Sequence, residues 1–134
     1  MGYILCIAEK HSVAKDIASV LGANTRGDGY YEGNGYRVTW AQGHLVVLEE
    51  PETYGYVSHK DVYKNKSVEA MAELPLFPNE FKYKIVEDSG AKTQFQNIKK
   101  LMKSNECIKV YNYGDAGTEG ELIQYLIREQ IGYK

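Results

Sequence analysis

Acidic residues stand directly after two apolar segments of this 134-residue chain. Glu9 follows the segment 3–8, and Asp115 and Glu119 follow the segment 107–113. Short runs rich in Ile, Val, Tyr and Cys are typical of strands buried on both faces, as in a parallel sheet. Ligands of open α/β sheets bind beyond the carboxyl ends of such strands, so these carboxylates are expected in one crevice. Carboxylate oxygens hold Mg²⁺, usually with waters and a substrate phosphate.

A second interpretation of the acidic residues needs no metal. Glu119 and Glu121 begin the next predicted helix, where the helix dipole favours negative charge, and Asp115 could be a turn residue. For Glu121 both interpretations stay open. The equivalent places of Glu9 and Asp115 at two strand ends favour a shared site for that pair.

The composition is that of one ordinary globular domain, with 43% hydrophobic and 25% charged residues. No apolar run reaches the roughly 18 residues that a membrane helix needs, and no signal peptide is recognisable, so no membrane partner is expected. Cys6 and Cys107 lie inside strand candidates and are predicted to be buried, reduced thiols of a cytoplasmic protein. The net charge of −2 argues against a free-standing nucleic-acid binder.

The first half of the chain predicts a strand, a helix and a hairpin. The strand over 3–8 leads into a helix capped by Ser12 and ended by Gly22. Segments 29–32 and 36–41 flank an Asn-Gly pair, the strongest short hairpin signal. The expected apolar stripe of the helix consists of Val13, Ile17, Val20 and Leu21.

The second half predicts a long excursion followed by alternating strands and helices. After a short strand over 44–48, residues 49–80 show little periodicity and hold all three prolines. A half-exposed strand over 81–86, a helix capped by Asp88 or Ser89, a buried strand over 107–113 and a last helix follow. The expected fold is α/β, with a mostly parallel central sheet flanked by helices and an insertion that contains a β-hairpin.

Four segments together resemble a known family. Residues 7–14 resemble the "AEKPSVA" opening of type IA DNA topoisomerases of the topoisomerase III group. Residues 29–45 are similar to its "YEGNGY…VTW..GHL" stretch, residues 74–78 to its "LPxxP" element, and residues 115–122 to its "DAGREGEL". The resemblances come in the same order over nearly the whole chain. They imply a Toprim domain, a Rossmann-like α/β module shared by topoisomerases and primases, over residues 1–134 as the N-terminal part of a longer topoisomerase.

The resemblance also implies roles for individual residues. Glu9 matches the invariant Toprim glutamate, Asp115 the first aspartate of the DxD element, and Glu119 the acidic residue after it. These three are the expected Mg²⁺ ligands, and Glu9 is also the expected general acid–base. Lys10 and His44 fall where they could contact DNA phosphate, although a solvated lysine and a structural histidine are alternatives.

Three positions depart from the family pattern. Gly117 stands at the second DxD aspartate, a change that the "DAGREGE" topoisomerases share. Thr118 replaces an arginine and cannot make its bidentate phosphate contact. His11 replaces the usual proline. Metal affinity is therefore expected to be weak.

The implied function is single-strand DNA cleavage, strand passage and religation without ATP, by the whole topoisomerase. The attacking tyrosine belongs to a later domain of the family, so the isolated domain is expected to be inactive. A Toprim nuclease or primase-type domain is the alternative enzyme. A degenerate Toprim domain that only binds a partner is the alternative outside enzymes, suggested by Gly117 and Thr118.

Overall fold

The computed structural model describes residues 2–57, 64 and 68–133. The chain divides into two units, Met1–Val46 with Ile85–Lys134, and Val47–Lys84. Every residue that the sequence predicts for the site belongs to the first unit. In the part of the chain that is described, no helix has the length and apolar character needed to cross a membrane.

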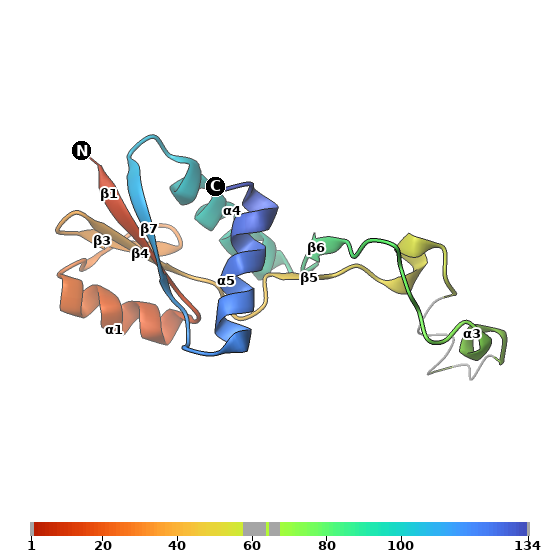
Figure 1. Cartoon of the computed structure of the whole chain (residues 1–134). Helices are drawn as coiled ribbons and strands as arrows, with labels where there is room; N and C mark the ends of the chain where they lie inside the picture. The colour runs from red at the N-terminus through yellow and green to blue at the C-terminus, as the bar shows by residue number, and fades with distance from the viewer. Residues whose placement is uncertain (1, 58–63, 65–67, 134) are drawn as a thin grey trace. The chain divides into compact units, whose positions relative to one another are not determined.

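A five-stranded sheet forms the centre of the first unit, in the order β2-β3-β4-β1-β7. Strand β1 (Tyr3–Ala8) lies between β4 (Tyr36–Trp40) and β7 (Cys107–Tyr113) and is parallel to both (Figure 1). Strands β3 (Tyr30–Gly33) and β2 (Thr25–Arg26) continue the sheet antiparallel. The α/β class is confirmed; the sheet is parallel at the strands that lead to the site and antiparallel on the hairpin side.

Helices cover both faces of this sheet. Helix α1 (His11–Leu21) packs on one face, and α4 (Ser89–Lys103) and α5 (Thr118–Ile131) pack on the other (Figure 1). Alternation along β1 serves both cores, because Leu5 contributes to the α4 and α5 side and Cys6 to the α1 side. Since both faces of β1 are buried, its continuous apolar sequence is explained.

The hairpin between β3 and β4 forms as its sequence predicts. Asn34 and Gly35 have φ values of 51° and 79°, so both turn residues are left-handed. This is the geometry that an Asn-Gly pair supplies with little strain and that matches the twist of the two strands. The hairpin thereby extends the sheet beyond β4.

The ends of α1 agree only partly with the prediction. Gly22 ends the helix with a left-handed φ of 73°, as expected. The prediction that Ser12 caps the helix is wrong, because Lys10 is the N-cap and makes no side-chain cap hydrogen bond. Of the predicted apolar stripe, Val13, Ile17 and Leu21 pack against the core as expected. The prediction is wrong for Val20, which is 87% exposed, and the small Ala14 is buried on the sheet in its place.

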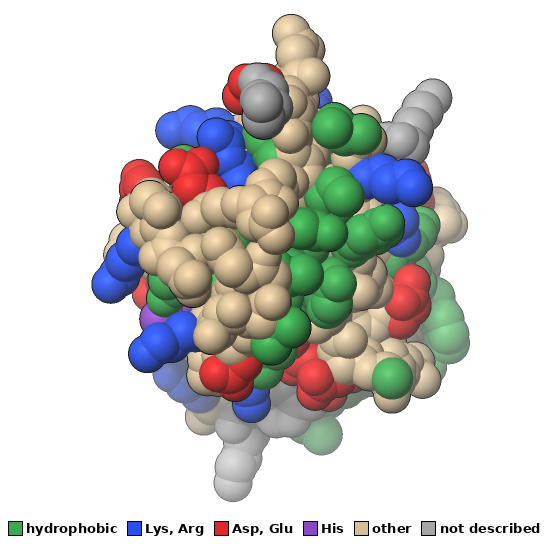
Figure 2. Space-filling model, turned by 90° about the vertical axis from the view of Figure 1, so that its left-hand side faces the viewer, with side chains coloured by type: hydrophobic (Ala, Val, Ile, Leu, Met, Phe, Trp, Pro, Cys, Tyr) green, Lys and Arg blue, Asp and Glu red, His purple; other side chains and the backbone are tan. Residues whose placement is uncertain are grey.

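Strand β7 is the edge of the sheet and is more exposed than its sequence predicts. Its described neighbour is β1 alone, and Ile108 is 67% exposed. Tyr111 and Tyr113, on the α1 side, are also substantially exposed. Figure 2 shows a face of the molecule on which hydrophobic side chains gather, with charged side chains around them. The prediction of a strand buried on both faces is therefore wrong for β7, because an apolar run does not distinguish central from edge strands.

The second unit is the predicted excursion, and it carries some regular structure. It contains a 3₁₀ helix, η1 (Pro51–Tyr54), and a short helix, α3 (Val68–Ala72). Strands β5 (Val46–Leu48) and β6 (Tyr83–Ile85) pair in a two-stranded sheet where the excursion leaves and rejoins the first unit. Both strands are shorter than the sequence predicts.

The two cysteines are free, as predicted, but only Cys6 is fully buried, while Cys107 is half-buried. Burial raises the pKa of the Cys6 thiol to about 11 and raises the pKa of the Cys107 thiol as well. At pH 8 roughly one Cys6 side chain in a thousand would be thiolate, the reactive form.

We expect Cys6 in a Cys107→Ser variant to react with Ellman's reagent only after denaturant unfolds the chain. The colour released with and without denaturant measures this. Because the folded pKa lies above the unfolded value, the contribution of Cys6 to stability is complete below about pH 9 and is lost as the pH rises toward 11. Fast reaction of the folded variant at pH 8 would contradict the burial of Cys6.

Candidate active site

Parallel pairing of β1 and β7 brings Glu9 and Asp115 to the same edge of the sheet. Ala8, the last residue of β1, is paired with Tyr113, the last residue of β7. Beyond these ends, the Asp115 backbone N–H donates to Glu9 Oε2 over 3.4 Å. The juxtaposition that the sequence predicts for this pair is therefore present, and the Glu9 carboxylate is only partly exposed.

Asn112 holds the acidic loop after β7 in place. Its Oδ1 accepts from the Gly114 N–H over 2.7 Å, and its Nδ2 donates to Glu121 Oε2 over 3.1 Å. Glu121 is thus engaged in bracing the loop, which favours the structural interpretation of that residue. This role of Asn112 was not predicted; the available signal was an amide inside an apolar strand, two residues before a glycine.

Gln124 fixes the following helix to the strand that carries Glu9. The side chain is 2% exposed, and its Nε2 donates to the carbonyl oxygen of Ile7 over 3.0 Å. A buried amide needs such a partner, because leaving it unpaired costs about 1–3 kcal/mol. The sequence carried a signal here as well, since Gln124 stands between the core residues Ile123 and Ile127 of α5.

Gly120 lets α5 begin directly against the acidic loop. A Cβ atom at this position would lie 2.2 Å from the Asp115 carbonyl oxygen. The backbone of Asp115 therefore occupies space that any side chain would need. Gly120 thereby allows the Asp115 backbone to pack directly against the start of α5.

His44 and Glu119 form a pair at the same edge. The His44 Nε2 and Glu119 Oε1 atoms are 3.1 Å apart, and both side chains are exposed. The loop that carries His44 is joined to β1, because the Gly43 N–H donates to the Glu9 carbonyl oxygen over 3.1 Å. Glu119 thus lies at the predicted edge, although its carboxylate contacts His44.

Lys10 and His11 directly follow Glu9 at the start of α1. The exposed Lys10 side chain makes no hydrogen bond or ion pair with any described residue, so it is available to an anion. His11 Nε2 is 2.8 Å from the hydroxyl oxygen of Tyr31, and its ring centroid is 4.4 Å from that of Trp40. The aromatic contacts of His11 were not predicted, since the three residues are far apart in sequence.

The carboxylates do not form a preassembled metal cage. Within the described ranges, no group of three His, Cys, Asp or Glu side chains is arranged to hold a metal ion. The donor chemistry nevertheless fits Mg²⁺, which takes one or two carboxylates and completes its shell with water and substrate phosphate. Glu9 and Asp115 supply such oxygens beside an open surface.

Comparison with known proteins decides the family. The family model of the Toprim domain matches residues 4–133 of the sequence. The chain belongs to the Toprim family. This confirms both the resemblance on which residues were assigned and the α/β fold that it implied.

Relatives of this Toprim chain are named DNA topoisomerase 3. It is 41% identical over 128 residues to DNA topoisomerase 3 of Shouchella clausii and 39% identical over 132 residues to DNA topoisomerase 3 of Bacillus anthracis. A putative DNA topoisomerase 3 of Staphylococcus aureus is 38% identical over 130 residues. These alignments cover 96%, 98% and 97% of the chain but only 16%, 17% and 17% of the relatives. The chain therefore spans about one sixth of their length.

Proposed function

We propose that this Toprim domain serves a type IA DNA topoisomerase, in which it supports cleavage and religation of one DNA strand with Mg²⁺. The observation that carries the proposal is the Asp115 N–H on the Glu9 carboxylate, at the carboxyl edge of two parallel strands. The DNA topoisomerase 3 relatives favour this activity over that of a Toprim nuclease or primase.

Glu9 is the proposed general acid and base. A carboxylic acid at this position would donate its proton to the 3′ oxygen as the phosphodiester breaks and accept a proton when the strand is rejoined. The Asp115 N–H and the end of β1 hold the Glu9 carboxylate in one place, which such proton transfer requires.

Asp115, Glu119 and Glu9 are the proposed Mg²⁺ ligands, directly or through water. A bound Mg²⁺ would position the phosphate and offset its charge. Glu119 Oε1 is 3.1 Å from His44 Nε2, so Glu119 would bind such an ion through its other oxygen or after turning away from His44. We expect weak binding, because one member of the set is engaged elsewhere and Gly117 stands where the second DxD aspartate would be.

Lys10 and His44 are the proposed contacts to DNA phosphate. Lys10 directly follows Glu9 and has no ion-pair partner among the described residues, and His44 is paired with Glu119. The two residues come from different segments that meet at Glu9, because the Gly43 N–H donates to the Glu9 carbonyl oxygen. These two residues would hold the scissile phosphate, although the net charge of the chain is −2.

A Toprim domain that binds a partner without catalysis is the second candidate. The absence of a three-ligand cluster among the residues described and the pairing of Glu119 with His44 favour it. In that case Lys10 and His44 would be its only proposed contacts to DNA. The two candidates differ in whether Mg²⁺ binds the carboxylates.

We expect Mg²⁺ to shift the backbone amide resonances of Glu9, Asp115 and Glu119 in a ¹⁵N NMR titration, at millimolar concentrations. The carboxylates repel one another, and a cation relieves that repulsion. Asp115→Asn should weaken the shifts severalfold, whereas Asp16→Asn, an exposed residue of α1, should leave them unchanged. Shifts confined to residues outside this edge, or none, would support the non-catalytic candidate.

A further inference from the structure

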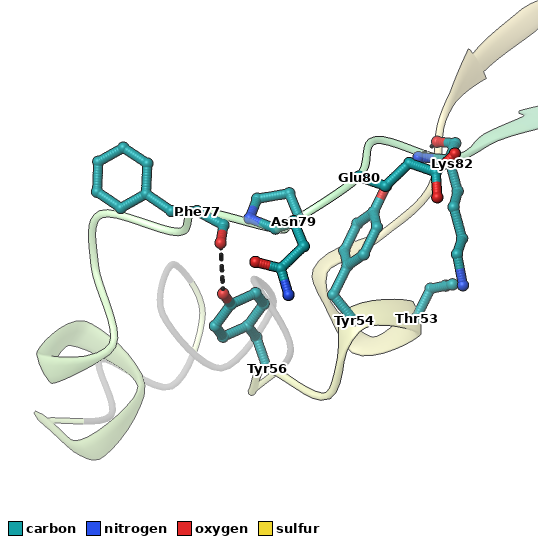
Figure 3. Close-up of a pocket in the computed structure, with 8 residues that line it drawn as sticks. Thr53, Tyr54, Tyr56, Phe77, Asn79, Glu80 and Lys82 are labelled. Atoms are coloured by element: carbon teal, nitrogen blue, oxygen red, sulfur yellow. Dashed lines mark hydrogen bonds between the residues drawn. The ribbon is translucent and has the colours of Figure 1, made fainter.

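We infer that the second unit carries a separate binding site for one nucleotide of a single DNA strand, the base between Tyr54 and Tyr56 and the phosphate at Lys82. A hollow of about 420 Å³ lies between segments 53–56 and 77–82 (Figure 3). Pockets of 300–1,000 Å³ are typical of small-ligand sites, so the space exceeds what one base needs. The inference goes beyond the carboxylate edge and rests on the proposed function for its DNA ligand.

The two tyrosine rings are fixed in place by their hydroxyl groups. The Tyr54 hydroxyl donates to the Lys82 carbonyl oxygen over 3.2 Å and accepts from the Lys82 N–H over 2.8 Å. The Tyr56 hydroxyl donates to the Phe77 carbonyl oxygen over 3.2 Å. Each ring therefore joins the two segments that line the hollow. Because the rings are already held in place, stacking of a base on them costs little further ordering.

Polar groups of the right kind lie beside the rings. In Figure 3 the Asn79 carboxamide extends toward Tyr56, while the ring of Phe77 points away. Asn79 makes no hydrogen bond with any residue that is described, so its donor and acceptor can both face a base edge. An amide beside an aromatic ring is suited to a flat ligand with donors and acceptors along its edge.

Charge at the rim favours an anion at one position and opposes it at another. The Lys82 side chain is in no ion pair with a described residue and lines the hollow together with Glu80. A DNA phosphate would gain from Lys82 and be repelled by Glu80. Because these effects have opposite signs, charge substitutions at the two positions test the site in both directions. A proline-rich peptide, which also docks on aromatic rings, would depend on neither charge in this way.

The test is fluorescence anisotropy of the whole chain with a fluorescein-labelled eight-nucleotide single strand of mixed sequence, at low salt with EDTA. EDTA removes Mg²⁺, so the result does not depend on metal binding at the carboxylate edge, and the variants below assign the binding to the hollow. Tyr56→Leu should weaken binding about tenfold, because stacking on an aromatic ring is worth roughly 1–3 kcal/mol per base. Tyr125→Leu, at a tyrosine of α5 that is 48% exposed, is the matched control and should bind like the parent chain.

Three further variants change exposed side chains, so that a change in binding would not reflect unfolding. Asn79→Ala removes an exposed side chain and should weaken binding severalfold, against Asn105→Ala as control. Lys82→Gln should weaken binding and lower the slope of log affinity against log salt by about 0.7, whereas Glu80→Gln should strengthen binding. Equal affinity in all these variants, or binding of a proline-rich peptide in place of the DNA, would overturn the inference.

Discussion

Glu9→Gln in a full-length topoisomerase that carries this domain is expected to reduce DNA cleavage and relaxation by about 10²- to 10⁴-fold. A general acid contributes this much to a reaction, and the glutamine amide cannot donate the proton that the 3′ oxygen requires. Glutamine can still accept the Asp115 N–H that Glu9 accepts over 3.4 Å, so the acidic loop should keep its position. Gel assays of single-strand cleavage and of plasmid relaxation measure the loss.

The control is Glu129→Gln, an exposed glutamate in the last turns of α5. It removes the same charge from the same unit and should leave both assays at the level of the parent protein. Thermal unfolding of the Glu9→Gln protein should match the parent, because Glu9 is at a partly exposed strand end. Relaxation at the parent rate would show that Glu9 is only a loop residue.

Gly120→Ala is expected to destabilise the fold and abolish the activity of the full-length protein. An alanine inside a helix normally gains up to about 1 kcal/mol over glycine. Here the added Cβ would lie 2.2 Å from the Asp115 carbonyl oxygen, and the backbone must move. Overpacking of this kind costs about 1–3 kcal/mol, so we expect a net loss of stability and a displaced Asp115.

Gly117→Ala separates this clash from a general effect of losing a glycine in the loop. A Cβ at Gly117 meets no atom within 4 Å, and its φ of 179° is extended backbone that other residues adopt. Its free energy of unfolding should stay within about 0.5 kcal/mol of the parent chain. Denaturant unfolding of both variants makes the comparison. If Gly120→Ala unfolds like Gly117→Ala, the contact with Asp115 does not constrain the helix.

The strand ends that carry the site could be predicted from the sequence, because their signals are local. One apolar run ends before Glu9 and a second ends before Asp115. The two residues meet if the strands are parallel neighbours, and they are. The hairpin turn was equally local, since Asn34 and Gly35 adopt the left-handed geometry that their types favour.

Other parts of the site depend on contacts between distant residues and could not be predicted from local patterns. The exposure of β7 follows from its place at the edge of the sheet, which its apolar sequence does not encode. Glu119 was assigned by motif, but its partner His44 comes from a loop 75 positions away. The bracing amides of Asn112 and Gln124 were visible only as polar residues in apolar settings, without an indication of what they hold.

The central place of β1 has a consequence for how the chain is made. Strand β1 pairs on one side with β4, and on the other with β7, which follows about 100 residues later in the sequence. At about 5–20 residues per second, β1 would wait roughly 5 to 20 s for that second neighbour. During this interval its apolar side chains lack half of their cover, so the nascent chain is expected to bind chaperones until β7 emerges.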